Sequence, residues 1–369
     1  DAASVAGADA LNAVKITTLP ATGTLQDAGV NVTAGQFVSV ADINGGTLVF
    51  TPDPDTFGAA YASFGFCVQD DGGTANGGVD LDTAPRVLTI DVAATNNAPV
   101  LSGAHDLASV NEDAVVNGGT LVSALIAGQV TDADAAAAAG IAVTAVDNGN
   151  GVWQYSVNGG ATWTAFGAPS DAAARLLAAD AGTYVRFVPN ADFNGTVAGG
   201  ITLRAWDQTA GTAGATADTT ANGGTRAFSA GSFASSISVA SVNDAPSATD
   251  HAVTTLEDTA YTFSVTDFGF TDAGDSPANA LLAVKITAVP ATGTLQNNGV
   301  DVSAGQLVSA ADISAGRLMY IPVANASGAG YASFTFGVQD DGGVANGGAD
   351  LELAQHAMTV NVIAVNDAP

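Results

Sequence analysis

The chain has 369 residues, 47% of them hydrophobic and 12% charged, which allows two to four domains with buried cores and excludes a disordered acidic tail. With 36 acidic residues against 8 basic ones, the net charge of −28 leaves little to neutralise phosphate, so we exclude nucleic acid and anionic membrane surfaces as partners. No apolar run reaches the ~18–20 residues of a membrane-spanning helix, and a single cysteine, Cys67, excludes an internal disulfide framework.

An internal repeat organises the chain. Residues 13–99 match residues 283–369 without a gap; for example, Pro-Ala-Thr-Gly-Thr-Leu-Gln occurs at both 20–26 and 290–296. A repeat of domain length indicates tandem domains rather than a solenoid, whose period would be ~20–50 residues. We therefore predict three domains, at residues 1–98, 99–245 and 246–369. Because the sequence has no initiator methionine and no signal peptide, we also expect it to be a piece of a longer protein.

The first domain lacks a part that the third one has. Residues 247–271 precede the repeated stretch and include the strand-like run Thr259–Val265, whereas the N-terminal residue Asp1 aligns close to Asp272. A sandwich without its edge strand leaves backbone groups unpaired. Either the sequence is cut here, or a neighbouring copy supplies the strand.

The middle domain has a different sequence with its own strand signals. Residues 153–157 and 161–166 flank Asn158-Gly159-Gly160, which predicts a hairpin, and residues 184–188 and 201–206 alternate with a period of two. The stretch 171–177 is the best candidate for a short helix, behind a Ser170 or Asp171 cap.

Each domain closes with a β-like run and a linker that ends in proline. The closing runs are 88–92, 236–239 and 358–362, and the linkers are 95–99, 242–246 and 365–369. Proline cannot donate to a sheet ladder, so it ends the strand and begins the joint between domains. Short strands with Gly, Asn, Asp and Pro turns predict an all-β fold of tandem Greek-key β-sandwich domains.

Acidic and amide side chains gather at the predicted domain ends. They follow each linker, end the penultimate strand or lie in the linker itself, and the candidates are Asn96, Asn97, Glu112, Asp132, Asp134, Asp207, Asn243, Asp244, Glu257, Asp272, Asp275, Asp340, Asn366 and Asp367. Calcium takes six to eight oxygen ligands of these kinds, and it relieves the repulsion between crowded carboxylates. The alternative is that each is an ordinary turn residue.

This combination resembles the cadherin-like repeats of large bacterial secreted or surface adhesins. The resemblance covers essentially the whole chain and includes residues 254–261, 339–343, 151–156 and 187–195. It implies cadherin-like or Ig-like sandwiches in a linear array, an extracellular location and calcium at the joints between adjacent repeats. The joint between the second and third domains would use Glu112, Asn243, Asp244, Asp272, Asp275 and Asp340.

The same resemblance assigns the remaining candidates. The joint between the first and second domains would use Asn96, Asn97, Asp132, Asp134 and Asp207, and it should bind calcium more weakly because Asn97 replaces the linker aspartate and the opening Glu is missing. Glu257, Asn366 and Asp367 would serve a further domain. Asp55 and Asp192 occupy positions where the family often has another ligand.

The predicted function is a stalk made rigid by calcium, and the chain is not predicted to be an enzyme. It has no His or Cys metal spacing and no nucleophile elbow. One alternative is an extracellular filament subunit completed by a strand from a neighbouring chain. Another is a glycan- or protein-binding middle domain in which Trp153, Trp163 or Trp206 stacks on a ligand, although aromatic residues in strands are more often core.

Overall fold

The computed structural model describes residues 9–366, and its 43% strand and 7% helix confirm the predicted all-β fold. The chain groups into two compact units. One contains the described residues up to Pro99 together with 131–137 and 221–230, and the other contains 100–130, 138–220 and 231–366. No helix in the described part of the chain is long and apolar enough to cross a membrane.

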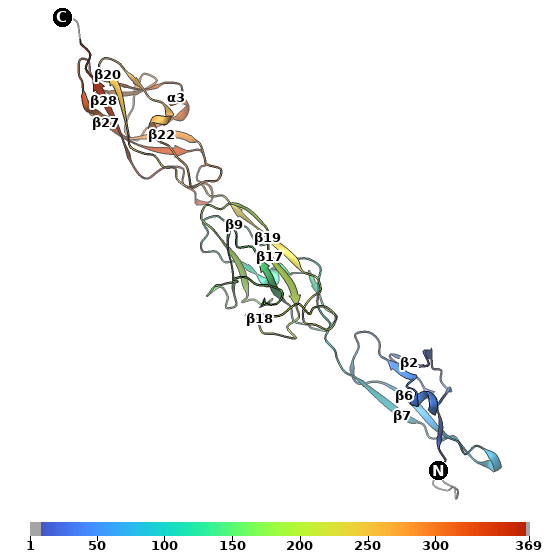
Figure 1. Cartoon of the computed structure of the whole chain (residues 1–369). Helices are drawn as coiled ribbons and strands as arrows, with labels where there is room; N and C mark the ends of the chain where they lie inside the picture. The colour runs from blue at the N-terminus through green and yellow to red at the C-terminus, as the bar shows by residue number, and fades with distance from the viewer. Residues whose placement is uncertain (1–8, 367–369) are drawn as a thin grey trace. The chain divides into compact units, whose positions relative to one another are not determined.

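The first segment (residues 9–98) has two sheets around a small core (Figure 1). Their strand orders are β4-β1-β6-β7 and β3-β2-β5, and the buried core consists of Ile16, Leu25, Val32, Val38 and Phe64. The elements are β1 (Leu11–Thr18), β2 (Thr24–Asp27), β3 (Val30–Asn31), β4 (Phe37–Ser39), α1 (Val40–Asn44), β5 (Leu48–Thr51), β6 (Gly58–Asp70), η1 (Ala75–Gly77) and β7 (Arg86–Val92).

The third segment (residues 246–366) repeats these elements and adds to both sheets. The orders become β20-β28-β27-β22-β25 and β21-β26-β23-β24, because β20 pairs in parallel with the last strand and β21 pairs with β26. The elements are β20 (His251–Leu256), β21 (Tyr261–Thr262), η2 (Val265–Phe268), β22 (Leu281–Ala288), β23 (Thr294–Asn297), β24 (Val300–Asp301), β25 (Leu307–Ser309), α3 (Ala310–Ser314), β26 (Leu318–Ile321), β27 (Gly328–Asp340), η3 (Ala345–Gly347) and β28 (His356–Ile363).

The middle segment (residues 99–245) has a six-stranded sheet, β18-β15-β12-β17-β19-β9, facing a four-stranded sheet, β10-β16-β13-β14, and a separate β11-β8 pair. The elements are β8 (Val100–Leu101), β9 (Val110–Asn111), β10 (Thr120–Leu121), α2 (Val122–Leu125), β11 (Val130–Thr131), β12 (Gly140–Val146), β13 (Gly151–Ser156), β14 (Thr164–Ala165), β15 (Ala174–Ala178), β16 (Tyr184–Pro189), β17 (Gly195–Trp206), β18 (Thr216–Ala217) and β19 (Phe233–Ala240).

The hairpin predicted around Asn158-Gly159-Gly160 is present, because β13 pairs with β14 antiparallel. The helix predicted at 171–177 is wrong: residues from Ala174 onward form β15. Leu176 and Leu177 are fully buried in that strand, which pairs with β12 and β18. Pairing on both sides outweighs the local helix preference of the alanine run.

Candidate metal centre

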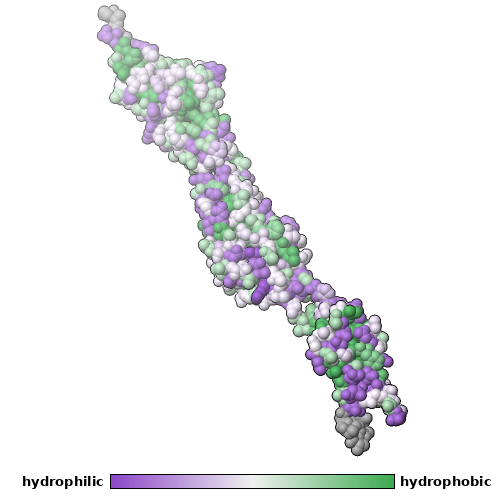
Figure 2. Space-filling view, turned by 45° about the vertical axis from the view of Figure 1, so that its right-hand side comes forward, coloured by the Kyte–Doolittle hydropathy of each residue, from purple (hydrophilic) through white to green (hydrophobic). Residues whose placement is uncertain are grey.

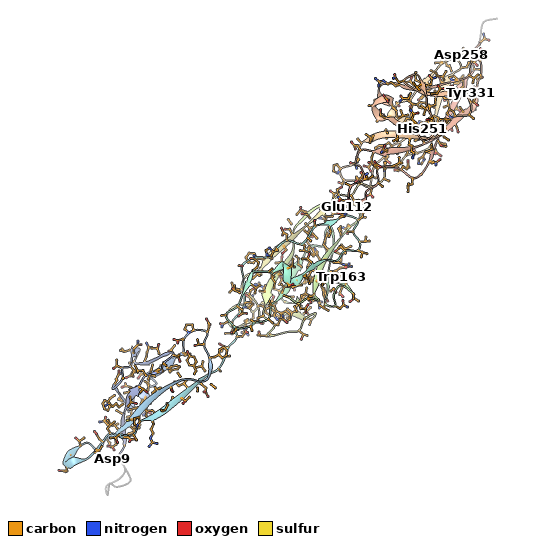
Figure 3. All side chains as sticks on the ribbon, turned by 180° about the vertical axis from the view of Figure 1, so that it is seen from behind. Asp9, Glu112, Trp163, His251, Asp258 and Tyr331 are labelled. Atoms are coloured by element: carbon orange, nitrogen blue, oxygen red, sulfur yellow. The ribbon has the colours of Figure 1, made fainter. Side chains whose placement is uncertain are left out.

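A buried glutamate fastens the linker that leaves the middle segment. β9 pairs in parallel with β19, which brings Glu112 beside the chain after Ala240, and the Glu112 N–H donates to the Ala240 carbonyl at 3.0 Å. The Val242 N–H donates to Glu112 Oε1, and Glu112 is only 1% exposed. Figure 3 shows Glu112 at the end of the middle segment, where the chain passes to the third.

Asn243 joins this linker to the third segment. Its side-chain amide donates to Asp340 Oδ1 at 3.0 Å and to the Ala349 carbonyl at 2.7 Å, while the Ala349 N–H donates to the Asn243 carbonyl at 2.8 Å. Asp340 ends β27 and is fully buried. Gly342 allows this approach, because a Cβ there would lie 1.6 Å from Asn243 Oδ1.

The two spaced aspartates lie in the loop before β22. The Asp244 N–H donates to Asp275 Oδ2 at 3.1 Å, and Asp272 Oδ2 accepts from the Asn279 N–H at 2.5 Å. Asp272 and Asp275 are 9% and 8% exposed, so both carboxyl groups are largely removed from water. The six residues predicted for this joint therefore belong to one connected arrangement around the linker 242–246.

Three contributors were not predicted. The Asn194 side-chain amide donates to Glu112 Oε2 at 3.0 Å and to the Ser276 carbonyl at 3.1 Å, so it bridges the middle and third segments. Asn279 donates to both Asp272 and Asn243. Asp113 is electrostatically coupled to Glu112 and Asp192. The run Asp192–Gly195 could have been recognised in the sequence, since it places another carboxylate and an amide in a turn. That this turn lies beside Glu112 follows only from the arrangement of the sheets.

Crowding and burial raise the pKa values of several of these carboxyl groups. Burial, with a smaller contribution from Asp272 and Asp244, raises the pKa of Asp275 from 3.8 to about 6. Burial also raises the pKa of Asp244, and so does the negative charge of Asp113, Asp192, Glu112 and Asp272. Burial raises the pKa of Asp340 as well. All three pKa values are raised, as expected for buried carboxyl groups that have negative charges and no positive charge beside them.

The donor set fits an oxygen-binding cation. Asp272 Oδ1 and Asp340 Oδ2 are buried and have no hydrogen-bond partner, an arrangement that is costly for carboxylate oxygens unless a cation or a proton satisfies them. No group of three or more His, Cys, Asp or Glu side chains among residues 9–366 already has the spacing of a metal site. A bound ion would therefore have to draw these carboxylates together.

Part of the other predicted joint lies in the first compact unit. The Asn97 N–H donates to Asp134 Oδ2 at 2.7 Å, and the Asn97 amide donates to Asp55 Oδ1 at 3.2 Å. The Asp134 N–H donates to Asp132 Oδ1 at 2.9 Å, and Asp132 Oδ2 is buried without a partner. A cavity of about 370 Å³ borders Asp55, Asn97 and Asp134.

The remaining predicted ligands are distributed as follows. The Asn96 amide donates to the Arg226 carbonyl at 3.2 Å. Asp207 belongs to the second compact unit, is 3% exposed and accepts from the N–H and hydroxyl of Thr209. Glu257 Oε1 accepts from the Val365 N–H at 2.6 Å, in the same arrangement as Glu112 and Val242. Asn366 is the last described residue, and Asp367 lies outside the described residues.

Two of the three tryptophans belong to the core. Trp153 is 0% exposed and Trp206 is 1% exposed, so neither presents a ring to a ligand. The Trp163 ring lies under the Arg186 guanidinium at 4.1 Å, a cation–π contact. The proposal that the middle segment binds glycans through these rings loses two of its three candidates.

No protein-family model and no curated protein sequence matches this chain. Among solved structures it is similar to mouse protocadherin-24 EC1-3, at 12% identity over 96% of this chain and 93% of that one, with a TM-score of 0.48. It is also similar to human mucin-like protocadherin EC1-2 (11%, 72% and 98%, TM-score 0.35) and Drosophila N-cadherin EC1-4 (11%, 96% and 67%, TM-score 0.29). At such scores neither family nor function follows, and the fold rests on the strand order described above.

Proposed function

We propose that this chain is a set of stalk repeats from a bacterial extracellular adhesin, rigidified by Ca²⁺ at the joints between its domains. The proposal keeps three domains, at residues 1–98, 99–245 and 246–369, and the three separate clusters of buried hydrophobic side chains among the described residues support this division. The observation that carries the proposal is the pair of buried, unpartnered oxygens, Asp272 Oδ1 and Asp340 Oδ2, at the joint between the middle and third segments.

At this joint the ion would be held by carboxylates from both sides. Glu112 comes from the middle segment, Asp244 from the linker, and Asp272, Asp275 and Asp340 from the third segment; Asn243 orients Asp340. Calcium would neutralise the negative charge of these carboxylates and fix the linker. We expect it to bind with a dissociation constant of about 10⁻⁴–10⁻³ M, as in other extracellular modules. The joint at 95–99 would bind calcium more weakly, because Asn97 supplies no charge.

The test is calorimetric titration of calcium into the whole chain, with small-angle scattering before and after chelation. Asp272→Asn combined with Asp340→Asn should remove the tighter class of sites and make the chain insensitive to calcium at this joint. Asp301→Asn, which removes an exposed carboxylate on β24, is the matched control. The proposal is wrong if the unsubstituted chain takes up no calcium at millimolar concentration.

A further inference from the structure

His356, the first residue of β28, lies between two carboxylates. Its Nε2 is 2.9 Å from Glu352 Oε1, and its Nδ1 is 3.4 Å from Oδ1 of Asp250, whose side chain is 76% exposed. A carboxylate oxygen can only accept a hydrogen bond, and a neutral imidazole carries a proton on only one of its two nitrogens. Both contacts are therefore favourable together only when the ring is protonated on both nitrogens and carries a positive charge.

The Glu352 carboxylate is buried in a way that calls for a positive charge beside it. Its side chain is 7% exposed, and Oε1 also accepts from the Ala248 N–H at 3.0 Å. Oε2 is buried and has no hydrogen-bond partner. Removing an ionised carboxylate from water is costly unless a cation is paired with it. His356 is in the position to supply that charge.

The other elements packed around the His356 ring add no charge to it. On β27, the ring centroid of Phe336 lies 6.1 Å from that of His356. On β20, His251 is exposed and forms no ion pair among the described residues. Asp350, in the same loop as Glu352, accepts from a side-chain amide of β27 at 3.0 Å. The charge of the ring is therefore balanced by Glu352 and, with more screening by solvent, by the exposed aspartate.

The same two carboxylates fasten the start of the third segment to the start of β28. The Ala357 N–H donates to Asp250 Oδ1 at 2.8 Å, and the Ala248 N–H donates to Glu352. Residues 248–250 lie between the linker and β20, which pairs in parallel with β28. A charge on His356 therefore acts at the point where the chain enters the third segment.

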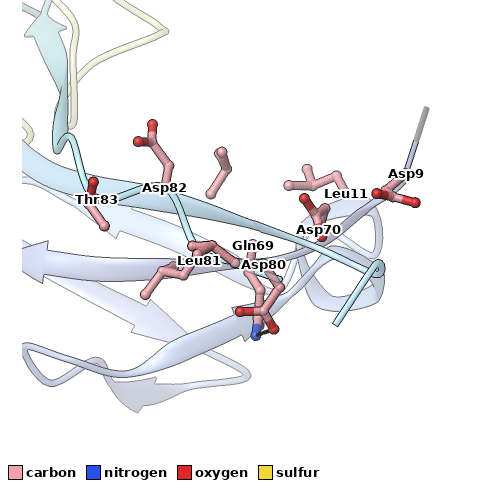
Figure 4. A pocket seen from close by; sticks show the side chains of 10 residues that line it. Asp9, Leu11, Gln69, Asp70, Asp80, Leu81, Asp82 and Thr83 are labelled. Carbon is pink, nitrogen blue, oxygen red and sulfur yellow. Dashed lines mark hydrogen bonds between the residues drawn. The ribbon is translucent and has the colours of Figure 1, made fainter. Parts of the chain in front are cut away.

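The first repeat has a permanent cation at the equivalent position. Arg86 aligns with His356 and Asp82 aligns with Glu352, and Arg86 Nε lies 3.9 Å from Asp82 Oδ2. Asp82 borders a cavity of about 580 Å³, and its side chain is 32% exposed (Figure 4). Arginine keeps its charge at every pH at which the protein is folded, whereas histidine changes charge between about pH 5 and 8. Both repeats thus place a cation here, but only the third repeat can lose it.

We propose that His356, Glu352 and Asp250 form a pH-sensitive latch, in which the charged ring holds the two carboxylates together and its deprotonation loosens residues 248–250 from β28. The folded chain pairs the charged ring with Glu352 and the unfolded chain does not, so the stabilisation is present at lower pH and is lost as the pH rises. The excess of 36 acidic over 8 basic residues also favours the charged ring. Hydrophilic residues lie on the visible face of each segment in Figure 2. Calcium has no part in this latch, because none of the three residues is a candidate ligand.

The test is hydrogen exchange of the whole chain in EDTA, at about pH 6 and about pH 8.5, on either side of the range in which histidine changes charge. Protection is expressed relative to the intrinsic exchange rate at each pH. We expect the protection of residues 248–256 and 356–363 to be roughly 5- to 10-fold lower at the higher pH, because a charge-assisted hydrogen bond is lost. His105→Gln is the control, since His105 Nε2 contacts the Ala127 carbonyl in the middle segment, and it should keep this pH dependence.

Three variants assign the effect to the latch. His356→Arg introduces the permanent cation of the first repeat and should be equally protected at both pH values. Glu352→Gln keeps an oxygen for the Ala248 N–H but removes the charge, so it should also abolish the pH dependence. His356→Gln, which is neutral throughout, should match the unsubstituted chain at the higher pH and be less protected at the lower one. A pH dependence that persists in His356→Arg or His356→Gln, or its absence from the unsubstituted chain, would overturn the proposal, and none of these results bears on the calcium titration.

Discussion

Glu112 and Val242 lie 130 residues apart in sequence, and the glutamate carboxylate accepts the backbone N–H of the valine. Glu257 and Val365 repeat this relationship across 108 residues, at 2.6 Å. The same geometry explains both contacts. An early strand (β9 or β20) pairs in parallel with the last strand of its segment (β19 or β28), and the glutamate just after the early strand accepts from the first residues of the outgoing linker. In Glu112 one carboxylate oxygen thus holds the linker, while the other accepts from the Asn194 amide and keeps a further lone pair for the joint.

The two roles of Glu112 can be separated by substitution. Glu112→Gln keeps an oxygen that can accept from Val242 but removes the acceptor for the Asn194 amide, so we expect a smaller loss of unfolding free energy than in Glu112→Ala, together with weaker calcium binding. Glu112→Ala leaves the Val242 N–H buried and unpaired, and it should cost about 1–3 kcal/mol. Chemical denaturation and calorimetry measure the two effects. Equal destabilisation by both substitutions would contradict the hydrogen-bonding role.

Asn243 is predicted to be needed as an amide. Asn243→Asp would replace the donor to Asp340 by a negative charge, so the calcium-free joint should lose about 1–3 kcal/mol of stability, and added calcium should restore part of it. Differential scanning calorimetry with and without calcium measures this. Asn298→Asp, in an exposed turn, adds the same charge and should have little effect. If Asn243→Asp loses the same stability with and without calcium, Asn243 stabilises the third segment but has no part in binding the ion.

The raised pKa of Asp275 predicts a pH dependence with a definite sign. Between pH 3.8, the ordinary pKa of an aspartate, and about pH 6, Asp275 binds more protons in the folded chain than in the unfolded chain. The stability of the metal-free joint therefore falls as the pH rises through this window. Calcium competes with the same proton, and its affinity should drop roughly 10-fold from pH 7.5 to pH 5. Calorimetric titration at both pH values tests this, and Asp275→Asn should flatten the dependence.

Gly342 provides a steric test of the joint. Gly342→Ala would put a Cβ against Asn243 Oδ1 and Asn279 Nδ2, so the Asn243 side chain would have to leave Asp340. We expect weaker calcium binding at this joint and a loss of about 1–3 kcal/mol. Gly118→Ala, which meets nothing within 4 Å, is the control. Unchanged calcium affinity in Gly342→Ala would show that Asn243 is not required to orient Asp340.

Several features were predictable because they depend on local pattern. The repeat of 13–99 at 283–369 gave matching elements, since similar sequences in the same order favour the same strands, although Leu88 is 42% exposed where its equivalent Met358 is fully buried. The hairpin at 158–160 also followed from its turn residues. The segment 171–177 was not predictable in this way, because the burial of Leu176 and Leu177 depends on the neighbouring strands β12 and β18.

Sequence alone also determined which oxygen-bearing residues lie in linkers and at strand ends, because these can be recognised by proline and by the loss of alternation. Only the tertiary structure decided which of them meet. Asn194 reaches Glu112 across 82 residues, and Asp340 is buried against Asn243 across 97 residues, because the sheets bring distant strand ends together. The unpaired oxygens of Asp272 and Asp340 are likewise a property of packing, since their lack of partners depends on what the fold removes from water.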